Sequence, residues 1–331
     1  MSIILGIEST AHTFGVGVVK NGKILANVRD MYHTEKGGIV PLEAAKHHRE
    51  NSEKIYSEAL EKSGIKEKEI DAIAFSQGPG IPPCLLEGIK FAKKTAEKLN
   101  VPLVPVNHCI AHLEIGKITG AKNPVMLYAS GANTQIIAYE SGKYRIFGET
   151  LDIGIGNFID NFAREMGIGF PGGPAIQKLA EGSKNYIELP YVVKGMDISL
   201  SGILTNLKQK FQSKKYSIED LAYSLQETVF AMLIETAERA IAHTGKKELL
   251  LGGGVSCNER LQEMCKKMCR ERSAKFFVPS RDLLVDNGAM IAFLGEIMFK
   301  AGIKFSKNKF DEIEIKPRQR TDEVEVKWKK N

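Results

Sequence analysis

The sequence lacks the features of several protein classes. No run approaches the roughly 18 consecutive apolar residues of a membrane-spanning helix. The first apolar segment, residues 3–7, leads directly into Glu8 and is too short for a secretory signal. The five cysteines are an odd number without a Cys-x-x-Cys pair, which argues against a secreted, disulfide-stapled fold. These absences predict a cytoplasmic protein that does not contact membranes.

The chain repeats itself at a spacing of 120 residues. Apolar strand, small polar turn, second strand and Gly-Lys turn occur at residues 5–23 and again at 125–143. The 331 residues suffice for about two domains. Two mixed α/β units therefore predict two lobes, residues 1–121 and 122–289, with a ligand cleft between them. Residues 290–331 are expected to form a C-terminal helix and tail that join the first lobe.

Two phosphate-binding motifs match only in their spacing. Residues 17–23 have the P-loop spacing, but Ile24 stands where a hydroxyl residue is required and the segment is a hairpin turn. Residues 167–172 have the dinucleotide spacing, but Pro171 interrupts it and a helix precedes it. Any bound nucleotide must therefore place its phosphates on other turns.

The repeat offers a pair of such turns. Ser9 and Thr10 lie in the first, and residues 130–133 (Ser-Gly-Ala-Asn) form the second. Small residues let backbone N–H groups approach phosphate oxygens, although tight hairpins favour the same residues without a ligand. The Gly-rich turn at 252–254, which includes Gly253 and Gly254, follows an apolar strand and would let a ligand lie against bare backbone.

Two further polar residues could either bind a ligand or serve only the structure. Asn258 could hydrogen-bond an adenine or ribose edge, or it could simply cap the helix that follows. Asp160 precedes a rigid loop rich in glycine and proline and could hold ribose hydroxyls, or it could pair with Arg164 at i,i+4.

A histidine pair provides the clearest chemical pattern. His108 and His112 are four residues apart, so a helix would present both imidazoles on one face for a metal ion. Asp286, expected at the start of a helix over 286–299, is the candidate third ligand because the repeat brings its helix opposite the histidines. Solvated histidines and an N-cap aspartate are the alternative. The same His spacing occurs in HExxH metalloproteases, but Cys109 stands where their glutamate base is required.

Other charged stretches carry less information. His47 and His48 lie in a charged helical stretch and are expected on the surface. The lysines between residues 205 and 215 and the basic excess of residues 300–331 hint at contact with nucleic acid, although solvated helices and tails often look alike.

Short motifs in a fixed order lie between residues 6 and 290, and the similarity that they mark extends from about residue 4 to residue 320. They are GIESTA (6–11), QGPG (77–80), VNHCIAH (106–112), YASGANTQ (128–135), GETLDIGIGN (148–157), FPGGP (170–174), GGVSCN (253–258) and VDNGAM (285–290). With this set the chain resembles the Kae-type/TsaD-type family of tRNA threonylcarbamoyltransferases, within the actin and heat-shock-chaperone ATPase superfamily. The resemblance implies a two-lobed actin-like fold, a duplicated ribonuclease-H-like α/β unit.

The resemblance also implies an activity and partners. Family members transfer the threonylcarbamoyl group of threonylcarbamoyl-AMP to the N6 amine of the adenosine 3′ of the anticodon, in tRNAs that read codons starting with A. Archaeal members work in the KEOPS assembly with a small atypical kinase/ATPase, a dimerising subunit and an accessory subunit. One metal ion per subunit is expected; two imidazoles and a carboxylate suit iron or zinc, and the resemblance favours iron.

Site residues follow from the resemblance position by position. It implies that His108, His112 and Asp286 hold the metal, with Tyr128 on or beside it. The donor adenylate, or ATP, would bind residues of the second lobe: Tyr128, Ala129, Ser130, Gly131, Ala132, Asp160, Gly173, Gln177 and Asn258.

Two positions depart from the family pattern. Ala132 stands where a second glycine is usual, which places a methyl group where phosphate would approach. Gln177 stands where a carboxylate is usual, although its amide can still bond ribose hydroxyls. Both changes bear on donor affinity, because neither removes a metal ligand.

Three other functions stay open at this point. They are a metalloprotease, an actin-like ATPase or kinase that would use Glu8 as its acidic residue, and a non-catalytic tRNA-binding scaffold.

Overall fold

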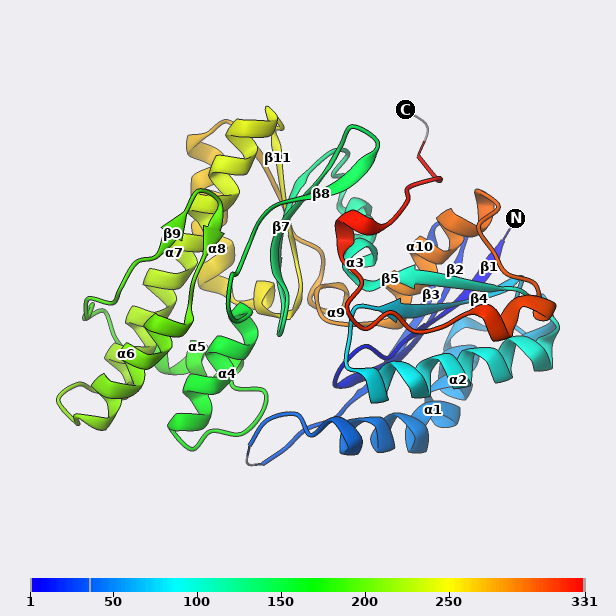
Figure 1. The fold of residues 1–331 in the computed structure, drawn as a ribbon, viewed down its shortest axis with the longest axis horizontal. Helices are drawn as coiled ribbons and strands as arrows, with labels where there is room; N and C mark the ends of the chain where they lie inside the picture. The colour runs from blue at the N-terminus through cyan, green and yellow to red at the C-terminus, as the bar shows by residue number, and fades with distance from the viewer. Residues whose placement is uncertain (1, 36, 330–331) are drawn as a thin grey trace.

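The computed structural model describes residues 2–35 and 37–329 and contains two five-stranded sheets of one design (Figure 1). The strand order is β3-β2-β1-β4-β5 in the first sheet and β12-β11-β6-β7-β8 in the second. Each sheet joins a three-stranded antiparallel meander to two parallel strands. The predicted duplication of a mixed α/β unit is therefore confirmed.

The elements follow each other in nearly the same order in both halves. The first half contains β1 (Ile3–Glu8), β2 (Thr13–Lys20), β3 (Lys23–Met31), α1 (Pro41–Ser63), β4 (Ala72–Gly78), α2 (Pro82–Leu99), β5 (Leu103–Asn107) and α3 (His108–Gly116). The second half contains β6 (Val125–Ala129), β7 (Thr134–Glu140), β8 (Lys143–Glu149), α4 (Ile155–Glu165), α5 (Gly173–Glu181), β9 (Val193–Lys194), β10 (Asp197–Ile198), α6 (Ser201–Gln212), α7 (Ile218–Thr244), β11 (Glu248–Gly252), α8 (Glu259–Glu271), β12 (Lys275–Phe277), α9 (Arg281–Leu284) and α10 (Gly288–Lys300).

Apolar side chains form three large buried clusters that divide the molecule into layers. One packs α1 and α2 on the first sheet, and one packs α4 to α8 on the second. The third lies between the two sheets around α3 and α10, which Figure 1 shows in the middle of the molecule. Because both sheets pack on this central pair of helices, residues at the helix starts can meet.

Helix α10 packs unusually closely on the first sheet. A Cβ on Gly17 of β2 would lie 2.2 Å from the backbone nitrogen of Ala289, and one on Gly6 of β1 would lie 2.2 Å from that of Ala292. Glycine is therefore required at both strand positions, because any side chain would push the helix away. Gly17, which has P-loop spacing in the sequence, serves helix packing instead.

The C-terminal tail continues along the same lobe. Phe305 pairs with Leu103 at the edge of β5, and the tail then reaches the second half, where Arg320 contacts Glu149 of β8. The division at residues 121/122 and 289/290 stays a prediction. Across the described ranges, no helix combines the length and apolarity needed to cross a bilayer.

Candidate active site

The two histidines lie at the start of α3, directly after β5. Asn107 caps this helix by accepting the backbone N–H of Ile110 at 3.1 Å, which fixes where the helix begins. His108 and His112 therefore share one face, with ring centroids 4.8 Å apart, and both are almost fully buried. The predicted helical placement of this pair is confirmed.

Asp286 meets the histidines from the segment between α9 and α10. The helix begins at Gly288 rather than at Asp286 as expected, and the side chain of Asn287 caps it by accepting the N–H of Met290. The N-cap role suggested for Asp286 thus belongs to its neighbour. Asp286 does not cap the helix, and its Oδ1 lies 3.4 Å from His108 Nε2 and 3.3 Å from His112 Nε2.

These donor atoms fit a metal ion. One ligand atom from each of His108, His112 and Asp286 lies within 4.8 Å of the others. Bonds of about 2.0–2.1 Å in a tetrahedral site place ligand atoms about 3.4 Å apart, which the two carboxylate-to-imidazole distances match. The adjacent Tyr128 hydroxyl is buried without a hydrogen-bond partner, as expected for a group that awaits a ligand. Within the described residues, this is the one group of histidine, cysteine and acidic side chains with such a geometry.

Glu8 contacts the ring nitrogen of His108 that faces away from Asp286. Its fully buried carboxylate lies 3.0 Å from His108 Nδ1 and also accepts the backbone N–H of Thr10 at 2.7 Å and its hydroxyl at 2.5 Å. A carboxylate on the far nitrogen of a ligand histidine fixes the tautomer and the ring orientation. The sequence alone does not predict this contact, although Glu8 ends β1 at the same end of the sheet where β5 leads into His108.

Burial and charge shape the acid-base state of these groups. Burial lowers the pKa of His108, but the carboxylates of Glu8 and Asp286 overcome it and place this pKa well above 6.5. Burial alone would raise the pKa of Asp286, yet the two imidazoles hold it well below the usual range. Burial dominates at His112, where it lowers the pKa, and at Tyr128, where it raises the pKa. A neutral His112 is the form that can bind metal.

The two predicted phosphate turns differ in exposure. Ser9 and Thr10 are buried, and Gly88 of α2 packs so closely on Ser9 that a Cβ there would lie 1.8 Å from its hydroxyl. The second turn, from Ser130 through Gly131 to Ala132, borders the start of α4 and leaves Ala132 exposed. Ala129, just before it, is the buried end of β6.

Packing requires glycine at the centre of the run at 252–254. Gly253 has φ +88°, and a Cβ on it would lie 2.4 Å from the carbonyl oxygen of Ala129, so β11 and the β6 turn meet backbone to backbone. Gly254 has more space, with Val285 as the nearest neighbour at 3.9 Å. Asn258 caps α8 by accepting the N–H of Leu261 and donates to Gln226, which is the structural role considered above.

The remaining predicted ligands lie around the loop before α5. The Asp160 carboxylate accepts the backbone N–H of Gly172 at 2.8 Å rather than pairing with Arg164. Burial raises its pKa. Gly173 begins α5 with free space beside its Cα, and Gln177 lies one turn later, half-buried. Their roles as nucleotide ligands stay predictions.

Two observations bear on the competing functions. Cys109, which replaces the glutamate base of a metalloprotease, is buried, and burial raises the pKa of its thiol. Glu8, the acid that an ATPase would need, is fully occupied by Thr10 and His108. Neither residue is placed for those alternative reactions.

Comparison with known sequences identifies the family. Residues 23–293 match the tRNA N6-adenosine threonylcarbamoyltransferase family, TsaD. Proteins of that name from Thermococcus sibiricus and Thermococcus kodakarensis are 58% and 57% identical over 326 residues, 98% of this chain and 100% and 99% of theirs. A probable bifunctional tRNA threonylcarbamoyladenosine biosynthesis protein of Methanosarcina mazei is 50% identical over 99% of this chain, which spans 60% of that longer protein.

Solved structures support the fold. HypF from T. kodakarensis superposes on 90% of this chain and 48% of its own, with a TM-score of 0.64 at 17% identity. Component A of (R)-2-hydroxyglutaryl-CoA dehydratase from Acidaminococcus fermentans covers 94% of this chain and 100% of its own, with a TM-score of 0.56 at 13% identity. With its two matching sheets, the molecule has the predicted two-lobed actin-like α/β fold. The chain belongs to the tRNA N6-adenosine threonylcarbamoyltransferase family, and the family and acyltransferase class expected from its sequence are confirmed.

Proposed function

We propose that this chain transfers the threonylcarbamoyl group from threonylcarbamoyl-AMP to the N6 amine of the adenosine 3′ of the anticodon, in tRNAs that read codons starting with A. The observation that carries the proposal is the convergence of His108, His112 and Asp286 beside the unpartnered hydroxyl of Tyr128. In the reaction, a C–N bond forms between the amine and the carbamoyl carbon, the C–O bond to phosphate breaks, and AMP leaves with the electron pair while the amine proton passes to solvent.

His108, His112, Asp286 and Tyr128 would hold one iron or zinc ion. When bound, the metal would polarise the phosphate or carbonyl oxygens of the donor and stabilise developing charge. Glu8 keeps the His108 ring oriented, and the buried α3–α10 contact keeps the site rigid. The donor is already an activated anhydride, so no protein nucleophile is needed.

The donor nucleotide is proposed to lie against the second-lobe turns. Gly131 and the exposed Ala132 offer backbone N–H groups at the start of α4, as a phosphate site requires. The N–H of Ser130 donates to the carbonyl of Asn133, so Ser130 would contribute its hydroxyl. The other proposed nucleotide contacts are Ser9, Thr10, Ala129, Asp160, Gly173, Gln177, Gly253, Gly254 and Asn258.

We also propose that the chain acts in the cytoplasm in a KEOPS-type complex. The Methanosarcina relative, whose name is bifunctional, is longer than this chain and supports a second activity working beside the transferase. The partners would be a small atypical kinase/ATPase, a dimerising subunit and an accessory subunit.

Reconstitution tests the proposal. The full chain, loaded with iron or zinc, is incubated with threonylcarbamoyl-AMP, unmodified tRNA and partner subunits, and the nucleosides are then analysed by mass spectrometry. One threonylcarbamoyl group on the adenosine next to the anticodon is the expected result. Unmodified adenosine together with steady ATP turnover in the absence of tRNA would replace the proposal with an ATPase function.

A further inference from the structure

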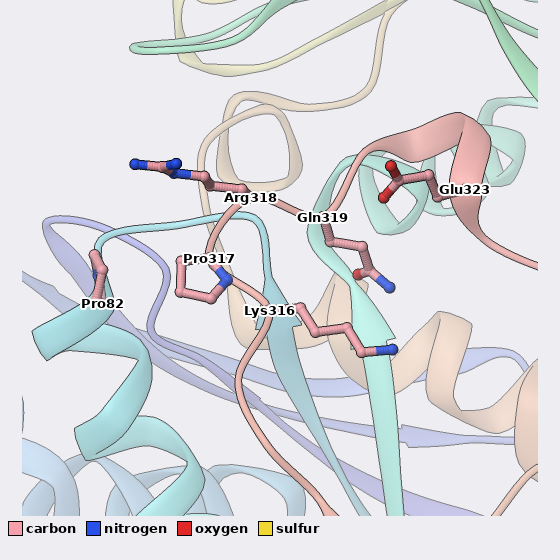
Figure 2. Close-up of a pocket in the computed structure, with 6 residues that line it drawn as sticks. All are labelled: Pro82, Lys316, Pro317, Arg318, Gln319 and Glu323. Atoms are coloured by element: carbon pink, nitrogen blue, oxygen red, sulfur yellow. The ribbon is translucent and has the colours of Figure 1, made fainter.

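The C-terminal tail forms a groove that the reaction site does not use. Its volume is about 620 Å³, and Figure 2 shows it at the tail turn near the start of α2. The lining side chains are Pro82, Lys316, Pro317, Arg318, Gln319 and Glu323. In the close-up, Lys316 and Arg318 leave the tail in different directions, one on each side of Pro317.

The tail backbone is held firmly at this groove. Lys316 donates its N–H to the carbonyl of Gln77 at 2.8 Å, and Gly80 donates to the carbonyl of Pro317 at 3.1 Å. The Gln77 side chain adds a bond to the carbonyl of Glu314 at 2.8 Å. Because the backbone on both sides of the turn is fixed, the two cationic side chains start from rigid positions, which reduces the entropy lost on binding.

The groove carries positive charge without internal partners. Arg320 pairs with Glu149 and Asp322, and Lys329 pairs with Glu114, whereas no ion pair of the described residues involves Lys316 or Arg318. Glu323 is the one acid of the lining, and its carboxylate accepts the backbone N–H of Arg320. The lining therefore has a net charge of +1, and its two cations are available for an external anion.

Helix α2 adds to this positive field. It begins at Pro82, its first turn contains no acidic residue, and no side chain caps it. The positive end of its dipole therefore faces the groove without a counter-charge from its own helix.

We propose that this groove binds the RNA backbone, with Lys316 and Arg318 each contacting one phosphate of the tRNA. The inference rests on the proposed function for its ligand, because a tRNA substrate supplies a polyanion whose phosphates are spaced along a strand. Two cations that point away from each other on a rigid turn suit separate phosphates of one strand better than they suit one compact anion.

A short path connects this groove to the reaction site. Asn107 donates its side-chain N–H to the Gln319 side chain at 3.1 Å, and Asn107 is the cap of the helix that begins with His108. A phosphate held in the groove is thus fixed relative to the histidines through two neighbouring residues. The groove would position the RNA strand near the reacting adenosine.

The test compares two double variants of the full chain by fluorescence anisotropy with an unmodified tRNA transcript. Lys316→Ala/Arg318→Ala removes the two groove cations. Lys307→Ala/Lys309→Ala removes two exposed cations from the preceding turn of the same tail, which also lack ion pairs. At roughly 0.7–0.9 released counterions per phosphate, the groove variant should bind about 15- to 30-fold more weakly at 0.15 M salt. Its plot of log affinity against log salt should flatten by about 1.4–1.8.

The control variant should keep the affinity and salt dependence of the wild type. Unchanged affinity in the groove variant, or an equal loss in both variants, would overturn the inference. The binding assay needs neither donor nor metal, so its result does not depend on whether the transfer reaction is observed. In the transfer assay, the groove variant should raise KM for tRNA and leave kcat within about twofold of the wild type, because its cations bind substrate away from the reacting atoms.

Discussion

The two halves of the molecule place different side chains at the same point of their sheets. Glu8 pairs with Gly15 between β1 and β2, and Tyr128 pairs with Gln135 between β6 and β7, so both pairs are related by the 120-residue repeat. Both side chains are fully buried next to the His-His-Asp group. Glu8 has all its bonds within the protein, whereas the Tyr128 hydroxyl has none. The two positions are therefore equivalent by the repeat but differ in role. Glu8 orients His108, whereas the Tyr128 hydroxyl is available to a ligand.

The turns after these residues differ in the same way. In the first half, the ring of His48 reaches the carbonyl of Ala11 at 2.9 Å and closes the turn with a side chain. In the second half, Gly156 and Asn157 of α4 donate backbone N–H groups to Ser130 and Gly131. The first turn is therefore part of the core. The second turn is held by the start of α4, and its residue Ala132 is exposed.

The largest expected effect comes from removing the two histidines of α3, next to which Glu8 of one half and Tyr128 of the other lie. His108→Ala combined with His112→Ala should lower bound metal from one ion per chain to almost none and reduce transfer by about 10³-fold, because the charge stabilisation from a metal is worth several kcal/mol. Bound metal is measured by elemental analysis, and transfer by nucleoside mass spectrometry.

His33→Ala is a suitable control because His33 is exposed and lies outside this group. Circular dichroism should show both variants folded. Full transfer by the metal-free double variant would remove the metal from the mechanism.

A second prediction concerns the pH dependence that only the first turn should show. His48 is expected on the surface from sequence but is fully buried, and burial lowers its pKa to about 4. The unfolded chain binds a proton near pH 6.5, so the stabilising contribution is complete above that pH and is lost as the pH falls to 4. The loss amounts to about 3 kcal/mol in the free energy of unfolding.

Urea unfolding of the wild type and of His48→Gln between pH 7 and 4 measures how much His48 contributes to the pH dependence of the free energy of unfolding. The variant should be less stable at pH 7 and should show a flatter decline. Parallel curves for the two proteins would contradict the assignment.

The sequence predicts the metal group better than its support, for a physical reason. His108 and His112 are four residues apart on one helix, which is a local pattern. The repeat of elements aligns the segment of Asp286 with that helix, so spacing and repeat together suffice. The Glu8–His108 contact spans 100 residues and depends on the strand order β1-β4-β5, which no local pattern contains. The burial of His48 likewise depends on how α1 packs on β2, and the charged stretch around it predicts the opposite.

Glu8→Gln should sharpen the comparison by converting the first half's carboxylate to a neutral group of the same shape. Loss of such a partner to a ligand histidine typically lowers metal affinity by about 10- to 100-fold. Competition with a metal-binding dye measures the affinity. Glu50→Gln, the same change at an exposed carboxylate of α1, should leave it within about twofold, and an equal effect of both variants would show that Glu8 has no specific role.

The smallest effect, and the sharpest contrast between the halves, is expected for Tyr128→Phe. Removing a buried hydroxyl without a partner should stabilise the metal-free chain by about 1 kcal/mol, since the desolvation cost of that hydroxyl disappears. With metal bound, the same change should lower metal affinity by about tenfold if the hydroxyl contacts the ion. Urea unfolding with and without chelator reads both states in one experiment. Because a purely structural tyrosine would shift both states equally, a change of sign on metal binding separates a ligand from a packing residue, and its absence would leave the two halves equivalent at this position.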